Sequence, residues 1–295
     1  MRRIRRVFWI AGVVLLAAAF VLLLHLSTNN MEFSRYNTGW NGTSTFFSDL
    51  DRHKTIDVYE PGKLATSPAN STLLLIAPKR DPTAQELAAY TAFLDKGNTL
   101  FLADDFGTGN KILTGVDSRV TILPGSLSSL DRRYADPYSV VAYRSIENGS
   151  ITVPASVALN RPAALDRGTP LMMSSVMSWI DANGNRRLNR GEEMGTFPVL
   201  VSEQRGRGRV IVLSDPSILI NSMYTQDENA DDRSLIRAFT GVNGTLYVDQ
   251  MNSRTADAAG LSEILHVIRT TIIIEIILLC LLMLALAWAW KKMMI

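Results

Sequence analysis

Two long apolar segments frame the chain, and a region that alternates between apolar and polar positions lies between them. Residues 7–26 contain no formally charged side chain, and residues 271–290 contain one, Glu275. A helix of this length rises about 30 Å, the thickness of the hydrocarbon core of a bilayer. The pattern therefore predicts two transmembrane helices that flank a domain at residues 27–270.

Basic residues lie at the outer ends of both apolar segments. They form short tails at residues 1–6 and 291–295, with Arg2, Arg3, Arg5, Arg6, Lys291 and Lys292. The positive-inside rule assigns such tails to the cytoplasm. Residues 27–30 offer no small-residue cleavage site, so the first segment is expected to remain as an anchor. The sequence therefore predicts a two-span cell-membrane protein with cytoplasmic termini and an extracytoplasmic main domain.

Strand and helix patterns alternate at the start of the central region. Residues 72–77 and 99–103 are nearly continuous apolar runs, as in strands that are buried on both faces. Between them, Thr83 and Glu86 form a capping box at the start of a helix that Gly97 ends. The apolar face of this helix is expected to carry Leu87, Tyr90, Thr91 and Leu94. This order and spacing predict a parallel sheet with right-handed crossovers.

The rest of the central region predicts a complete α/β domain of three layers. Further strands are expected at residues 56–59, 197–202, 209–214 and 246–249, and helices at residues 43–52 and 229–240. The two runs within residues 197–214 are joined by a Gly/Arg-rich turn, which favours a hairpin at the margin of the sheet. Residues 124–170 have weaker periodicity and several prolines, which indicates an insertion with strand character that extends over about residues 124–196.

Charge and cysteine usage exclude several functions of the central region. Without the six terminal basic residues and Glu275, it retains 24 basic and 27 acidic residues, a net charge of about −3. A nucleic-acid partner is therefore not expected. The single cysteine, Cys280, lies in the second apolar segment. The domain thus has no disulfide, no thiolate metal site and no cysteine nucleophile.

Polar residues follow two of the predicted parallel strands. Asp104 and Asp105 come directly after residues 99–103, Asp215 and Ser217 come after residues 209–214, and Asn221 lies one helical turn further on. Parallel sheets place their ligands at the carboxyl ends of their strands. Such side chains either bind a cation, a sugar or a basic group, or cap the following helices. The sequence leaves both interpretations open.

A loop before residues 197–202 has the spacing of a calcium loop. Its candidate ligands are Asp181, Asn183, Asn185, Arg187 through its backbone carbonyl, Asn189 and Glu192. Arg186 occupies the sixth place, where calcium loops carry glycine, and only two of the ligands are charged. A calcium-clamped loop and an ordinary Asn/Gly turn both remain open. No cofactor is required, and calcium is the one that the sequence suggests.

Two further features depend on the membrane topology. Four glycosylation sequons lie on the side that is expected to be outside, at Asn41, Asn70, Asn148 and Asn243. Glu275 lies about one turn into the second apolar segment. An ionisable side chain there either pairs with another membrane helix, relays protons, or extends to the interface.

With these motifs in place, the chain resembles the prokaryotic family named domain of unknown function 4350. The resemblance covers about residues 34–250. It rests on residues 34–39 with 42–44, on the strand-helix-strand unit, and on residues 195–198 leading through 206–217 to Asn221. The resemblance implies a membrane-anchored protein whose domain is similar to class I glutamine amidotransferases, which have a flavodoxin-like fold.

The resemblance also has consequences for activity. Active amidotransferases present a cysteine on the turn after a central strand, where this sequence has Asp104 or Asp105. Without a cysteine outside residues 271–290, glutaminase activity is excluded. Similar proteins are often encoded beside a MoxR-type ATPase and a von Willebrand-like protein, which implies work in an assembly or transport system by association alone.

The sequence therefore favours a non-catalytic domain that binds a partner protein or a surface glycan through Asp104, Asp105, Asp215 and Asn221. One alternative is a hydrolase that uses paired carboxylates or a metal at the same place. Another is an accessory subunit of a transporter complex, with Glu275 facing another helix.

Overall fold

The computed structural model describes residues 12–14, 17–18, 21–22, 29–50, 54–131, 135–145, 151–225, 230–240, 244–256, 283 and 288. Within these residues, no helix combines the length and the apolar character that a membrane crossing requires. The prediction of two flanking transmembrane helices is corrected accordingly, and the membrane location and lipid partner that rested on it are withdrawn. An apolar run indicates only a capacity for insertion. Most of residues 7–26 and nearly all of residues 271–290, with Glu275, lie outside the described residues.

A mixed sheet forms the centre of the described domain. Its nine strands have the order β1-β12-β2-β3-β11-β10-β8-β5-β6. The first five are parallel: β1 (Thr55–Val58), β12 (Leu246–Asp249), β2 (Thr72–Ile76), β3 (Thr99–Ala103) and β11 (Gly208–Leu213). The others pair antiparallel: β10 (Pro198–Arg205), β8 (Thr169–Ser174), β5 (Ser139–Arg144) and β6 (Ser156–Asn160). The predicted mainly parallel, flavodoxin-like or amidotransferase-like sheet is therefore wrong.

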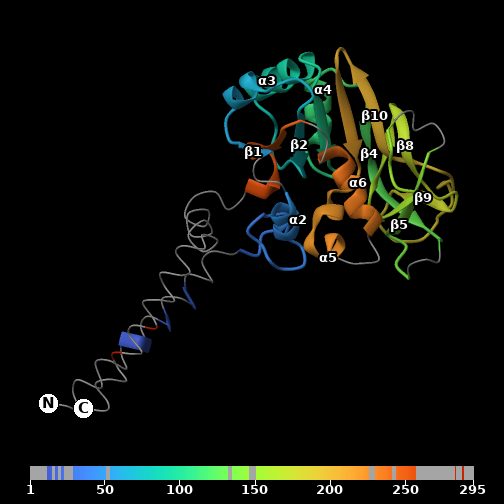
Figure 1. Ribbon diagram of the computed structural model, residues 1–295. Helices are drawn as coiled ribbons and strands as arrows, with labels where there is room; N and C mark the ends of the chain where they lie inside the picture. The colour runs from blue at the N-terminus through green and yellow to red at the C-terminus, as the bar shows by residue number, and fades with distance from the viewer. Residues whose placement is uncertain are drawn as a thin grey trace.

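The antiparallel half explains this correction. The segment interpreted as an insertion does not fold apart from the sheet, because β8 pairs with the free edge of β10, and β5 and β6 extend the sheet beyond it. A smaller sheet has the order β7-β4-β9, with β7 (Ala163–Asp166), β4 (Thr121–Ser129) and β9 (Ser178–Asp181). Figure 1 shows β5, β8 and β9 at the end of the domain away from α3.

Helices cover both faces of the parallel half (Figure 1). One face packs against η1 (Pro61–Thr66), α3 (Ala84–Asp95) and α4 (Gly109–Gly115). The other packs against α2 (Ser44–Asp49), η2 (Pro216–Leu219), α5 (Asn221–Tyr224) and α6 (Ala230–Thr240). A last short helix is η4 (Arg254–Ala256). A hydrophobic core lies on each face of the sheet, and successive strand residues point into opposite cores. Leu74 and Phe101 lie in one core, and Leu73 and Leu100 lie in the other.

The helix predicted from the capping box, α3, is confirmed, although its buried face differs from the predicted one. The Thr83 side chain accepts a hydrogen bond from the backbone of Glu86, and the Glu86 side chain accepts one from the backbone of Thr83. Its buried residues are Glu86, Tyr90, Phe93 and Leu94. Phe93 therefore takes the core place that was predicted for Thr91, because the helix presents a face one residue away from the expected one.

Candidate functional site

The neighbouring strands β3 and β11 mark the point at which the connections of the sheet change faces. The two strands are parallel, and Ala103 pairs with Leu213 at their carboxyl ends. After β3 the chain enters α4 on one face, and after β11 it enters η2 and α5 on the other. Such a topological switch point is where open α/β sheets bind ligands. We call the group of Asp104, Asp105, Phe106, Arg161 and Asp215 at this point the carboxyl edge.

Asp104 lies beneath the surface of the carboxyl edge. Only 1% of the residue is exposed. Its carboxylate accepts hydrogen bonds from the backbone N–H groups of Gly107 (3.1 Å) and Gly109 (2.8 Å). A Cβ on either glycine would lie 2.5 Å from this carboxylate, so both positions require glycine. Burial and, to a smaller extent, the charge of Asp105 raise the pKa of Asp104 to about 7, against the effect of these hydrogen bonds.

Asp215 has the same role on the neighbouring strand. It is fully buried, and its carboxylate accepts hydrogen bonds from the backbone N–H groups of Asn160 (2.5 Å) and Ser217 (2.8 Å). Burial raises its pKa to about 7, and the charge of Asp105 adds to the effect. Asp104 and Asp215 thus shape the loops of the edge, as the capping interpretation predicts, while their backbone partners leave them little access to a ligand.

Asp105, Phe106 and Arg161 form the outer part of the carboxyl edge. Asp105 is half-buried, and burial raises its pKa. Phe106 is 49% exposed, and the Arg161 guanidinium lies 5.2 Å from its ring centroid. The same guanidinium lies 5.2 Å from the ring of Tyr138, and Arg161 Nε donates to Ser126 Oγ at 2.9 Å. The edge therefore presents a stacked aromatic and guanidinium surface beside a carboxylate.

Sequence reasoning missed Arg161 and Tyr138. Arg161 follows β6, and Tyr138 immediately precedes β5, so both belong to the antiparallel half. Arg161 adopts a left-handed backbone with φ of 59°. A left-handed arginine is uncommon, but it leaves no mark in a single sequence.

Asn221 is buried, and its side-chain amide bonds to the backbone of a neighbouring segment. It is 7% exposed. Its Oδ1 accepts a hydrogen bond from the backbone of Thr45 (2.9 Å), and its Nδ2 donates to the carbonyl oxygens of Gly39 (2.7 Å) and Asn37 (3.1 Å). A Cβ at Gly42 would lie 1.9 Å from the Asn37 carbonyl oxygen. The family motifs around residues 34–44 and Asn221 are therefore one packing unit.

The loop from Asp181 to Glu192 is held by its own side chains. Asp181 accepts hydrogen bonds from the backbone of Gly184 (2.8 Å), Asn185 (3.1 Å) and Arg186 (2.7 Å). Tyr138 Oη also donates to it, at 3.1 Å. Burial alone would raise the pKa of Asp181, but these hydrogen bonds hold it below its usual value.

The remaining candidate ligands of the loop also bond within it. Asn183 Oδ1 accepts a hydrogen bond from the backbone of Asn185, and Asn185 Oδ1 accepts one from Arg187. Glu192 accepts hydrogen bonds from the backbone of Ala182 and Asn189. Arg186 has φ of 63°, the left-handed conformation that calcium loops give to glycine at the sixth place. In the described part of the chain, no three His, Cys, Asp or Glu side chains gather as a metal cluster.

The sequons are divided between described and other residues. Asn41 is half-buried and its Oδ1 accepts a hydrogen bond from Asn37, whereas Asn70 is exposed. Asn148 and Asn243 lie outside the described residues. Glycosylation of Asn70 remains a prediction.

Comparison with known proteins identifies the family. Residues 35–231 match the family model described as "Domain of unknown function (DUF4350)". This match spans more than half of the chain, so the chain belongs to the DUF4350 family. No curated protein matches it by sequence. The family match confirms neither the membrane anchoring nor the amidotransferase-like domain that the resemblance implied.

Solved structures show distant likeness. The structure titled "mmIFT52 N-terminal domain" has 13% identity and a TM-score of 0.46, and covers 63% of this chain and 83% of that one. A beta-galactosidase from Bacillus circulans sp. alkalophilus has 10% identity and a TM-score of 0.34, with coverage of 56% and 22%. One from the haloarchaeon Halorubrum lacusprofundi has 16% identity and a TM-score of 0.29, with coverage of 59% and 22%. At these TM-scores, none of the three bears on activity.

Proposed function

We propose that this member of the DUF4350 family is a non-catalytic binding domain that captures a partner protein at its carboxyl edge. The observation that carries the proposal is the stack of Arg161 between Phe106 and Tyr138 at the topological switch point. Aromatic and arginine side chains dominate the binding energy of protein interfaces. Phe106, with about half of its surface exposed, is the central contact.

The stack is held in place before any partner arrives. Asp104 holds the backbone of the loop that carries Phe106, through Gly107 and Gly109. Arg161 is held by two rings and by Ser126. A rigid contact surface loses little conformational entropy on binding, which favours affinity.

The accessibility of the carboxylates argues against catalysis. A pair of catalytic acids must reach the reacting bond, but Asp104 and Asp215 are buried and bonded to backbone amides. A carboxylate hydrolase is the second candidate, because a pKa of about 7 suits a general acid. A surface glycan is a further candidate ligand, since Asp105 offers a carboxylate beside an exposed ring.

The cellular context of this proposal is an accessory role in an assembly or transport system. Only the family resemblance, including its association with MoxR-type ATPases, supports that context. The transporter-subunit alternative rested on Glu275, which lies outside the described residues.

The test compares partner capture by full-length variants. Tagged native chain, Phe106→Ala and Arg161→Asn are used to retain proteins from an extract of the source cells, followed by quantitative mass spectrometry. Asparagine tolerates the left-handed backbone at position 161. Trp40→Ala is the matched control, because Trp40 is 70% exposed and lies outside the carboxyl edge.

We expect one or more partner proteins that the native chain and Trp40→Ala retain in equal amounts. Phe106→Ala and Arg161→Asn should each retain about tenfold less of such a partner, as for interface hot spots. Equal retention by all four chains would contradict the proposal. A glycan array distinguishes a sugar ligand from a protein partner, because only a sugar-binding chain would bind to the array. Hydrolysis by native chain that Asp105→Asn abolishes would favour the enzyme instead.

A further inference from the structure

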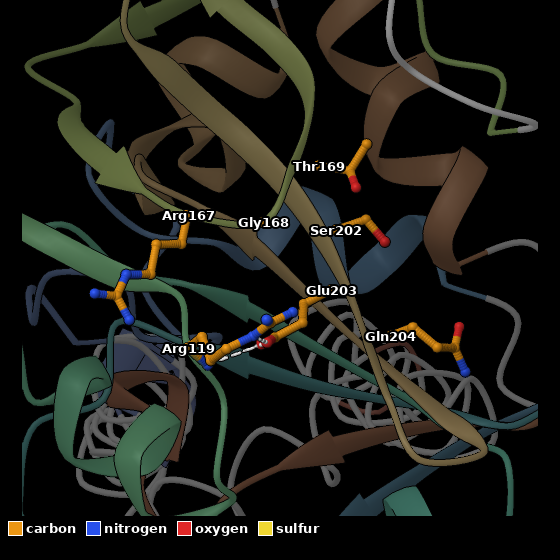
Figure 2. A pocket seen from close by; sticks show the side chains of 7 residues that line it. All are labelled: Arg119, Arg167, Gly168, Thr169, Ser202, Glu203 and Gln204. Carbon is orange, nitrogen blue, oxygen red and sulfur yellow. Dashed lines mark hydrogen bonds and ion pairs between the residues drawn. The ribbon is translucent and has the colours of Figure 1, made fainter.

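A second polar site lies at the opposite end of β11 from Asp215. Strand β8 ends its pairing with β10 at Thr169, opposite Ser202, whereas β10 continues to Arg205. The space beside this free length of β10 is an open pocket of about 560 Å³ (Figure 2). We call it the β10 notch; its lining residues are Arg119, Arg167, Gly168, Thr169, Ser202, Glu203 and Gln204.

One side of the notch has an arginine that a buried carboxylate orients. Glu203 is 6% exposed, whereas the Arg119 side chain is 76% exposed. Arg119 donates to Glu203 through its backbone N–H (3.0 Å) and through Nε (3.0 Å), and Ser118 Oγ donates to the same carboxylate. Burial alone would raise the pKa of Glu203, but these bonds hold it below its usual value. A fixed, charged partner on Nε leaves the two Nη groups of Arg119 as donors.

A second arginine lies on the same side. Arg167 is 65% exposed, and its Nε lies 3.6 Å from Asp166. Figure 2 shows Arg167 and Arg119 on the same side of Gly168. Gly168 has φ of 80°, and a Cβ there would lie 3.2 Å from Val120 and Val201. Among the described residues, neither guanidinium has a hydrogen-bond partner for its Nη groups.

The other side of the notch offers neutral polar groups. Thr169 and Ser202 are opposite residues of an antiparallel pair, so their side chains lie on one face, and Gln204 follows on that face. Figure 2 shows these three side chains away from the arginines. Gln204 Nε2 donates to the carbonyl oxygens of Gly206 (3.1 Å) and Gly208 (2.9 Å), which leaves its Oε1 as an acceptor. This side suits hydroxyl groups, which both donate and accept.

We infer that the β10 notch binds a small phosphorylated sugar or polyol, with its phosphate group on Arg119 and Arg167 and its hydroxyl groups beside Ser202, Thr169 and Gln204. Guanidinium groups match the geometry of phosphate oxygens. Pockets of about 300–1,000 Å³ hold small molecules of this class. The site is separate from the carboxyl edge, so it stands whether or not that edge binds a partner.

The test is titration calorimetry of the full-length chain with glucose 6-phosphate, inorganic phosphate and glucose at constant ionic strength. Arg167→Asn removes one guanidinium and tolerates the left-handed backbone of position 167. Arg144→Gln is the matched control, since it removes the same charge from an exposed residue of β5 outside the notch. Ser202→Ala removes one hydroxyl from the neutral side.

We expect saturable binding of glucose 6-phosphate by native chain and by Arg144→Gln, and about tenfold weaker binding by Arg167→Asn, as for the loss of a charge-assisted hydrogen bond. Ser202→Ala should weaken glucose 6-phosphate but not inorganic phosphate. No saturable binding of glucose 6-phosphate, or equal losses in Arg144→Gln and Arg167→Asn, would overturn the inference. An unchanged affinity of Ser202→Ala would overturn the assignment of the hydroxyl side.

Discussion

Two regions of this domain bury carboxylates with opposite effects on their pKa values. At the carboxyl edge, burial raises the pKa of Asp104 and Asp215 to about 7. In the antiparallel region, which comprises β10 of the large sheet and β9 of the smaller one, the pKa values of Glu203 and Asp181 are held below their usual range, although burial is again the largest influence. Asp104 and Asp215 are nevertheless more deeply enclosed by protein than Asp181 and Glu203, so burial contributes to the difference between the two regions.

The donors and charges around each carboxylate also differ. Asp104 and Asp215 each accept two backbone N–H groups, and a neighbouring acid, Asp105, opposes their ionisation. Asp181 accepts three backbone N–H groups and a tyrosine hydroxyl, and Glu203 binds an arginine. Depth of burial, neighbouring charge and hydrogen-bond donors together thus decide whether such an acid stays ionised.

The pH dependence of stability gives the sharpest contrast between the two regions. Asp104 and Asp215 have folded-state pKa values of about 7 against an ordinary 3.8. At pH values between these two, the folded chain therefore binds more protons than the unfolded chain. Their stabilising contribution is complete below about pH 4 and is lost as pH rises through about 7. Because a tenfold change in proton affinity corresponds to about 1.4 kcal/mol, the loss is on the order of 4 kcal/mol per group at most.

Urea unfolding of the full chain between about pH 5 and pH 8 measures this effect. Asp215→Asn should flatten the profile, because the amide does not titrate. Asp181 and Glu203 have the opposite sign, with stability lost only as pH falls through their lowered pKa values. A native profile that rises from pH 5 to pH 8 would break the comparison.

Removing the ionised carboxylate of Asp181, at the end of β9 in the smaller sheet, should destabilise the fold by nearly as much. Asp181→Ala leaves three backbone N–H groups and the Tyr138 hydroxyl without their acceptor. We expect a loss of about 3 kcal/mol in the free energy of unfolding, since each group left without a partner costs about 1–3 kcal/mol when water does not replace the acceptor. Urea unfolding at neutral pH measures it, with exposed Asp81→Ala as the control; a loss below about 1 kcal/mol would show that water replaces the carboxylate.

Glu203 tests whether charge or shape holds the antiparallel half together. Glu203→Gln keeps the size of the side chain but replaces a charge-assisted bond to Arg119 with a neutral one. We expect a loss of about 1–2 kcal/mol, and a smaller salt dependence of stability than in the native chain. Unchanged stability at low salt would mean that the pair makes no net contribution, as many ion pairs do not.

The sequence predicted the parallel half well because the signals there are local. The strands β2 and β3 are short apolar runs, and the capping box of α3 lies within four residues. The positions of Asp104 and Asp215 at one edge followed from the parallel topology. Arg119 and Glu203 are 84 residues apart, and their contact depends on which antiparallel strands pair. No local pattern specifies that pairing, so the sequence did not reveal the β10 notch.

Calcium should have the smallest effect on stability. Its effect decides whether the loop from Asp181 to Glu192 is a calcium loop or an Asn/Gly turn. The left-handed backbone of Arg186 already provides the turn that a calcium loop needs, and Asp181 and Glu192 provide carboxylates at its first and twelfth places. The loop side chains nevertheless accept hydrogen bonds from its own backbone, and Arg186, Arg187 and Arg190 offset their charge. We therefore propose weak, millimolar binding, which low ligand charge favours.

Thermal unfolding of the full chain with millimolar calcium or with chelator measures this binding. A ligand that binds only the folded state raises the unfolding midpoint, and near its dissociation constant the gain is below about 1 kcal/mol. Glu192→Gln should abolish the rise, whereas Glu193→Gln, which changes the neighbouring carboxylate outside the twelve-residue spacing, should not. A rise that both variants retain would place the ion elsewhere. No rise in the native chain would make the loop an Asn/Gly turn that its own hydrogen bonds hold, because four donors on Asp181 then suffice without a cation.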